Sequence, residues 1–176
     1  MITQEDNLIL QTYYTVMLLK ELGEVKFEDS IQFDNLNLQS DIKQALKEEI
    51  GIQNQGSAIM ALYAMLVIPK EIIENEFEQE YEKINEFLRK EVTLHFTTYK
   101  GEDENDLSSI NLIRHARNSV AHAKISFTPG ICITFYDSYI KYSSEISFSL
   151  PLDRFGHFLN SLGNIHLEYI KKRKNL

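Results

Sequence analysis

Arginine, histidine and asparagine side chains are concentrated in one short stretch, residues 112–123. On a helical wheel at about 100° per residue, its apolar residues share one arc. The remaining side carries two arginines, two histidines and an asparagine: Arg114, Arg117, Asn118, His122 and His115. We therefore expect a helix over residues 110–124 that presents cationic and proton-transferring groups on its polar face.

These residue types suit the cleavage of an RNA backbone. Arginine binds phosphate through a forked set of donors, and histidine transfers protons near neutral pH. A neutral imidazole can take the proton from a ribose 2′-hydroxyl, and a guanidinium can stabilise the charge that builds on the phosphoryl oxygens. A second histidine, or the same one in a later step, can protonate the leaving 5′-oxygen. Such chemistry needs no metal and no cofactor.

Most of the chain around this stretch has apolar residues at helical spacing. The pattern predicts helices over residues 3–23, 40–50, 58–68, 70–97 and 153–172, with Thr3, Ser40, Ser57 and Asp153 as N-caps. Residues 24–39 read as a loop with a short irregular element. Apolar and polar residues alternate in about residues 125–150, which predicts two or three antiparallel strands before the last helix. The expected fold is mainly α, a bundle of about five helices with a small β insertion.

Composition is that of a packed protein: 176 residues, 43% hydrophobic and 25% charged, with a net charge of −8. We expect one domain over residues 1–176. The single Cys132 cannot form an internal disulfide. The start of the chain has no signal-peptide pattern and the longest apolar run is too short to span a bilayer, so a cytoplasmic protein without membrane contact is expected. The acidic total disfavours a broad nucleic-acid-coating surface and leaves room for a local basic site.

The sequence Arg117-Asn118-x-x-x-His122 resembles the Arg-(polar)-x-x-x-His signature of the HEPN superfamily. The context is similar too, because a long helix precedes the motif helix and one more helix closes the chain. Strands before the final helix occur in some subfamilies. The specific resemblance covers roughly residues 107–170.

The resemblance implies a metal-independent endoribonuclease acting in a toxin–antitoxin or phage-defence setting. It implies a homodimer whose motif helices face each other, RNA as the substrate and an antitoxin protein as a further partner. Arg117 would be the phosphate-binding catalytic arginine, His122 the catalytic histidine and Asn118 the supporting polar group. Arg114 and His115 lie outside the signature, and their place on the wheel assigns them auxiliary substrate-binding roles.

Helix geometry gives an independent reason to expect a dimer. Arg117 and His122 are separated by about 7.5 Å along the axis and about 140° around it, so they flank the polar face of one straight helix. Two such helices around a twofold axis would bring arginine and histidine from both chains into one cleft.

Other interpretations stay open. The polar face could pair with the acidic stripe of residues 71–86 and have no catalytic role. The chain could be an inactive HEPN-like module that binds RNA, a nucleotide or a protein, or a plain helical interaction domain. A metal bound jointly by His115 and His122 is disfavoured, because about 10.5 Å separates them along the helix axis.

Overall fold

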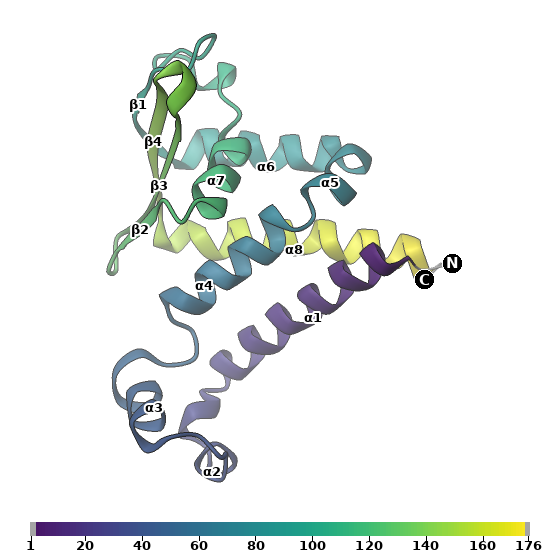
Figure 1. The fold of residues 1–176 in the computed structure, drawn as a ribbon, viewed down its shortest axis with the longest axis vertical. Helices are drawn as coiled ribbons and strands as arrows, with labels where there is room; N and C mark the ends of the chain where they lie inside the picture. Colours follow the sequence, from purple (N-terminus) through teal and green to yellow (C-terminus); the bar gives the residue numbers. More distant parts are fainter. Residues whose placement is uncertain (1–2, 175–176) are drawn as a thin grey trace.

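A computed structural model describes residues 3–174 of the protein. The helices are α1 (Gln4–Glu24), α2 (Ile31–Asp34), α3 (Ser40–Ala45), α4 (Gln55–Leu62), α5 (Lys70–Ile73), α6 (Glu78–Glu91), α7 (Leu112–Ala121) and α8 (Leu152–Lys174). The strands are β1 (Thr93–Thr97), β2 (Ile125–Thr128), β3 (Cys132–Tyr139) and β4 (Ser144–Pro151), and they form one antiparallel sheet in the order β1-β4-β3-β2. The expected mainly α fold with a small sheet before the last helix is confirmed (Figure 1).

Several short turns of helix extend or connect these elements. Two π-helical turns, Leu46–Ile50 and Tyr63–Val67, continue α3 and α4. The 3₁₀ helices are Phe27–Asp29, Glu74–Glu76, Leu107–Ser109 and Ile140–Tyr142. No helix within residues 3–174 is long and apolar enough to cross a membrane.

The N-terminal ends of two helices follow their local sequence. Thr3 caps α1 as expected, in a capping box completed by Asp6. The helix expected to be capped by Ser57 begins earlier, because Asn54 is its N-cap and Ser57 is the third residue of the capping box. The Asn54 side chain accepts a hydrogen bond from the Ser57 backbone N–H, and the Ser57 hydroxyl accepts one from the Asn54 backbone N–H.

The expected continuous helix over residues 70–97 is wrong. It is interrupted at Glu74–Glu76, and α6 ends at Glu91. Residues Thr93–Thr97 instead form β1, whose backbone pairs with the edge of β4. The segment contains two threonines, a leucine and a phenylalanine, which fit a strand as well as a helix end. Pairing with a strand some fifty positions later in the chain decides between the two.

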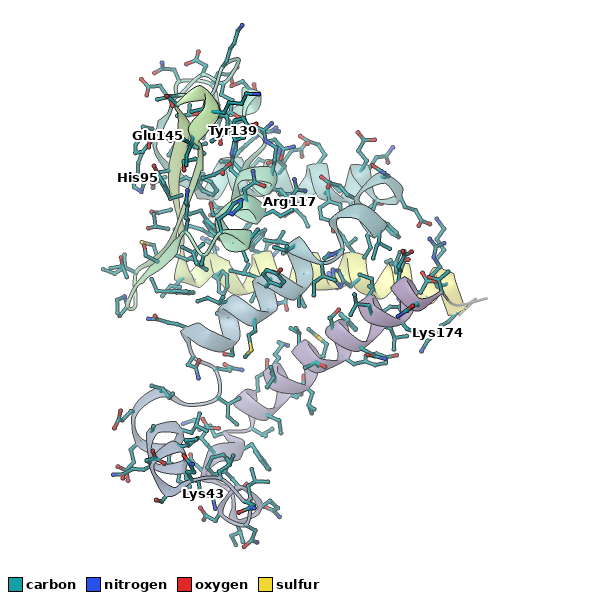
Figure 2. The ribbon with its side chains drawn as sticks, viewed as in Figure 1. Lys43, His95, Arg117, Tyr139, Glu145 and Lys174 are labelled. Carbon is teal, nitrogen blue, oxygen red and sulfur yellow. The ribbon has the colours of Figure 1, made fainter. Side chains whose placement is uncertain are left out.

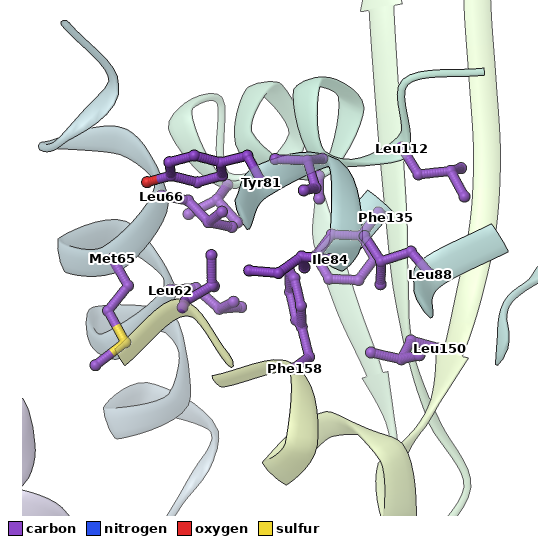
Figure 3. Close-up of a cluster of buried hydrophobic side chains, with 14 of the residues drawn as sticks. Leu62, Met65, Leu66, Tyr81, Ile84, Leu88, Leu112, Phe135, Leu150 and Phe158 are labelled. Carbon is purple, nitrogen blue, oxygen red and sulfur yellow. The ribbon is translucent and has the colours of Figure 1, made fainter. Parts of the chain in front are cut away.

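The core lies between the inner face of the sheet and helices α4, α6, α7 and α8. Figure 3 shows its centre, where Phe135 of β3 and Leu150 of β4 meet Ile84, Leu88 and other helix side chains. All of these are less than a tenth exposed. Side chains at alternate positions of β3 and β4 point into this core, as the alternating pattern predicts.

Residues 25–51, here called the arm, project away from this core. Figure 1 shows α2 and α3 beyond the end of α1, at the opposite end of the long axis from α7. Phe33 is the one large apolar side chain buried among the described residues of the arm. The arm corresponds to the segment expected to be a loop with an irregular element, followed by the helix that begins at Ser40.

Candidate functional site

The motif helix α7 packs against β3 on one side and α6 on another. The Asn111 side chain caps its start by accepting a hydrogen bond from the Arg114 backbone N–H at 3.0 Å. At the other end Ala123 adopts a left-handed conformation with φ 53°, and the Lys124 backbone N–H donates to the Ser119 carbonyl at 2.7 Å. The Ala123 backbone N–H also donates to the Val120 carbonyl at 3.1 Å, and these two hydrogen bonds define a Schellman motif. It stops the helix at Ala121, three residues before the expected end.

His122 is therefore the C-cap residue of α7 and not part of its last turn. Its side chain is exposed. Within the described part of the chain its imidazole makes no hydrogen bond or ion pair. A solvent-exposed histidine at a fixed helix end can accept a proton from a bound molecule or donate one to it.

Arg117 has the opposite environment, because only 8% of it is exposed. It lies on α7 (Figure 2), and its guanidinium donates a hydrogen bond of 2.8 Å to the carboxylate of Glu74. Glu74 comes from the 3₁₀ turn between α5 and α6, and 36% of its side chain is exposed. Burial and the nearby charge of Glu74 raise the pKa of the neighbouring Tyr81 above its ordinary value.

Arg117 and His122 of the motif have different environments. Glu74 belongs to the acidic stripe that was weighed as the partner of the polar helix face. Arg117 follows that interpretation, since its charge is matched within the same chain. His122 does not follow it, because it faces solvent.

His115 was expected on the exposed polar face of the helix. It is instead fully buried, with 0% of its surface exposed. Its Nδ1 lies 2.7 Å from Oδ2 of Asp137, and its Nε2 lies 2.7 Å from Oε1 of Glu102. Nε2 also lies 2.9 Å from Nη2 of Arg114, so charged side chains contact both nitrogens of the buried ring. The helical wheel places His115 correctly around the axis, but β3 and the loop after β1 cover that position.

Asp137 joins this network to the motif. Its Oδ2 accepts hydrogen bonds from His115, from Asn118 Nδ2 at 3.0 Å and from the Tyr99 hydroxyl at 3.1 Å. Burial raises the pKa of Asp137, but the hydrogen bonds from His115 and Asn118 outweigh it and hold the pKa below its ordinary value. Burial and the charge of Asp137 raise the pKa of Tyr99 to about 12. Asp137 thus fixes the side-chain amide of Asn118.

Arg114 is the exposed arginine of α7, with 44% of its side chain accessible. Its guanidinium lies 2.9 Å from Glu102 and 5.7 Å from the ring centre of Tyr99. Glu102 also accepts a hydrogen bond from Thr97, which ties the acidic loop after β1 to the site. The Arg114 side chain is thus accessible from solvent, whereas His115 is not.

Sequence reasoning missed Asp137 and Glu102 as parts of this site and placed Glu74 only within the acidic stripe that could pair with the polar helix face. One signal for Asp137 is visible in the sequence. It follows Ile133 and Phe135 at alternate positions, which puts a carboxylate on the core-facing side of β3. A buried carboxylate needs a partner, and the nearest polar helix supplies it. Across residues 3–174, no three metal-ligating side chains are grouped closely enough to hold a metal ion.

The comparisons with known proteins place the chain in a family. No curated protein and no solved structure matches it with significance. The family model described as HEPN pEK499 p136 matches residues 5–173, which is nearly the whole chain. This match agrees with the resemblance of the Arg117-Asn118-x-x-x-His122 motif and with the helical fold around it. The chain belongs to the HEPN pEK499 p136 family.

Proposed function

We propose that the protein is a metal-independent endoribonuclease of the HEPN type, with Arg117, Asn118 and His122 at its active site. The observation that carries the proposal is the environment of His122. It is an exposed imidazole that has no hydrogen-bond or ion-pair partner among the described residues, at the end of the helix that also carries the arginine and the asparagine of the motif. A structural histidine would be packed or hydrogen-bonded, whereas a proton-transfer group must be open to substrate.

In this reaction the 2′-hydroxyl of a ribose attacks the adjacent phosphorus, and the bond to the 5′-oxygen of the next nucleotide breaks. His122 in its neutral form takes the proton of the 2′-hydroxyl. A protonated histidine, from the second subunit or in a later step from the same one, returns a proton to the 5′-oxygen. The products are a 2′,3′-cyclic phosphate and a 5′-hydroxyl. Arg117 stabilises the negative charge on the phosphoryl oxygens during the transfer.

Arg117 needs its counterion to be replaced before it can hold a phosphate. Glu74 is the group that a phosphate would replace, and its partial exposure leaves a path from solvent. A carboxylate and a phosphate oxygen accept the same hydrogen bonds from a guanidinium. In the absence of RNA, Glu74 then holds the Arg117 side chain in a fixed position.

Asn118 has a supporting role in this proposal. Asp137 holds its amide nitrogen, and Asp137 is itself held by His115 and Tyr99. The Asn118 side chain is thereby fixed one helical turn before His122. A rigid polar group next to the reacting phosphate reduces the cost of ordering the substrate. His115 and Asp137 are positioning residues.

The proposal includes a homodimer formed through α7, in which His122 side chains from two subunits share one cleft. One imidazole can then act as the base while the other acts as the acid. The family resemblance supports a cytoplasmic toxin–antitoxin or phage-defence role, with an antitoxin protein as the partner that silences the enzyme.

Incubation of the protein with total RNA in EDTA tests the activity. We expect cleavage with 2′,3′-cyclic phosphate ends, and a loss of at least about 100-fold in Arg117→Ala and in His122→Ala. His157→Ala is the matched control, because His157 is an exposed histidine on α8. Equal cleavage by all four proteins would refute the proposal, since it would indicate a contaminating nuclease.

A second function is favoured by the Arg117–Glu74 ion pair. A counterion within the chain and only 8% exposure also fit a non-catalytic HEPN module that binds RNA or another protein. Retention of RNA on the protein without cyclic phosphate products would select this function. Loss of that binding in Arg114→Ala, the exposed arginine, would then locate the bound RNA on α7.

A further inference from the structure

The chain exposes more surface than a compact monomer of its size. Its accessible surface is 10684 Å². A folded monomer of 20.5 kDa exposes about 8,900 Å². The excess of roughly 1,800 Å² is larger than the area of about 800 Å² that one partner contributes to a standard interface.

The arm, residues 25–51, carries much of the exposed apolar surface. Among the described residues, sixteen large apolar side chains are exposed, and six of them lie in the arm: Val25, Ile31, Leu36, Leu38, Ile42 and Ile50. Ile31 is 76% exposed and Val25 is 70% exposed. A segment this short cannot build a core of its own. Its apolar residues therefore need a surface to cover them.

A groove of about 1000 Å³ opens beside the root of the arm. Its walls come from α1, α4, the turn between β2 and β3, and the start of α8. Apolar side chains dominate the lining, including Val16, Met17, Ala61, Met65, Phe127 and Phe155. Gly156 of α8 also lines it, and a Cβ atom at this position would meet no other atom within 4 Å. The groove is thus wide enough to accept side chains from outside.

The arm cannot fold back into the groove of its own chain without breaking the contacts at its root. Glu28 accepts a hydrogen bond from the Ile52 backbone N–H at 3.3 Å, and Gln53 donates one to the Lys20 carbonyl at 3.0 Å. Glu49 and Ile50, near the end of the arm, already line the groove. These contacts direct the arm outward.

We propose that the arm of one copy occupies the groove of a second copy, and that the two copies exchange arms around a twofold axis. Both surfaces are apolar, both are uncovered and both belong to the same chain. A reciprocal exchange covers all four surfaces at once, as an isologous interface does. A different protein seated in the groove would leave the arm exposed.

This contact is separate from the pairing of α7 helices in the proposed function. Lys43 in the arm and Arg117 on α7 lie in distant parts of the molecule (Figure 2). The arm exchange therefore requires neither nuclease activity nor contact through α7. Where the α7 contact joins a different pair of copies from the arm exchange, loss of the arm exchange still halves the mass of the assembly.

Sedimentation velocity over a wide range of protein concentration tests the exchange. The arm variant is Ile31→Glu with Ile42→Glu, which alters two exposed side chains. The groove variant is Gly156→Leu, which fills open space and places a better helix former in α8. We expect each to halve the mass of the wild-type assembly. Ile140→Glu is the control, because Ile140 is an 89% exposed isoleucine far from the groove and should leave the mass unchanged.

A mixture of the two defective variants distinguishes arm exchange from general loss of association. The arm variant retains an intact groove and the groove variant retains an intact arm, so a mixed pair regains one of its two contacts. We expect the mixture to associate at lower concentration than either variant alone. An unchanged mass in both variants overturns the proposal, and so does a mixture that associates no better than its components. Circular dichroism confirms that each variant is folded.

Discussion

Replacement of Glu74 by glutamine should weaken the fold and strengthen RNA binding at the same time. Glu74 accepts a 2.8 Å hydrogen bond from Arg117, whose side chain is 9% exposed, while its own is 36% exposed. Glutamine keeps an acceptor oxygen for the guanidinium and removes the negative charge. If RNA phosphate takes the place of Glu74, the same ion pair that stabilises the free protein opposes RNA binding.

The size of both effects follows from the position of the pair. Exposed ion pairs contribute about 0.2–1 kcal/mol. Breaking a fully buried pair costs about 3–5 kcal/mol. The contribution of a pair with one buried and one partly exposed member lies between these two values, and we take it as about 1–1.5 kcal/mol. Glu74→Gln should therefore lower the free energy of unfolding by about 1 kcal/mol and lower the Kd for RNA by about 5–10-fold.

Urea denaturation measures the first effect, and fluorescence anisotropy with a 2′-O-methyl RNA measures the second. This RNA lacks the attacking hydroxyl and stays intact during the measurement. Salt must be held constant, because phosphate contacts are salt-dependent. Glu82→Gln is the matched control: Glu82 pairs with Arg89 at 2.7 Å on α6, so its loss changes the net charge equally without freeing Arg117. Equal gains in RNA affinity for both variants, or weaker binding by Glu74→Gln, would refute the reasoning.

Three further predictions concern stability. Asp137→Ala should lower the free energy of unfolding by about 1–3 kcal/mol, because it removes the carboxylate that His115, Asn118 and Tyr99 share; an unchanged free energy of unfolding in urea would contradict this network. Ala123→Gly should raise the unfolding free energy by about 0.5–1 kcal/mol, since relief of left-handed strain exceeds the entropic cost of glycine; a lower midpoint in thermal denaturation would show otherwise. Burial lowers the pKa of His166 to about 4 from an ordinary 6.5, so the unfolded chain binds the extra proton between these values. Protonation of His166 therefore does not affect the free energy of unfolding above pH 6.5, and it lowers that free energy by about 3 kcal/mol as the pH drops to 4. Urea titrations at several pH values should show this slope reduced in His166→Gln, and an identical slope would disprove the assignment.

Local sequence determined several features that the structure confirms. Thr3 and Asp6 form the capping box of α1, and the alternation of apolar residues in residues 131–150 yields strands with Phe135 and Phe148 in the core. The motif Arg117-Asn118-x-x-x-His122 by itself predicts the superfamily, and the family match over residues 5–173 agrees. Each of these signals comes from residues a few positions apart, whose backbone geometry fixes their relation.

Contacts between distant segments decided the rest. The helical wheel placed His115 and Arg117 on a polar face, but whether that face is exposed depends on what packs over it. Asp137 of β3 and Glu102 of the loop after β1 cover His115, and Glu74 covers Arg117. Periodicity could not foresee β1 either, because pairing with β4 converts a helix-like pattern into a strand.

Arg117 and His122 show most clearly which properties the sequence determines and which the tertiary structure determines. Sequence alone determined that an arginine and a histidine occur in one short segment with the spacing of the HEPN signature. Tertiary structure decided that the arginine is buried beside a carboxylate of its own chain, while the histidine faces solvent at a helix end. The physical reason is that burial and charge pairing are properties of the space around a side chain. Segments far apart in the sequence fill that space.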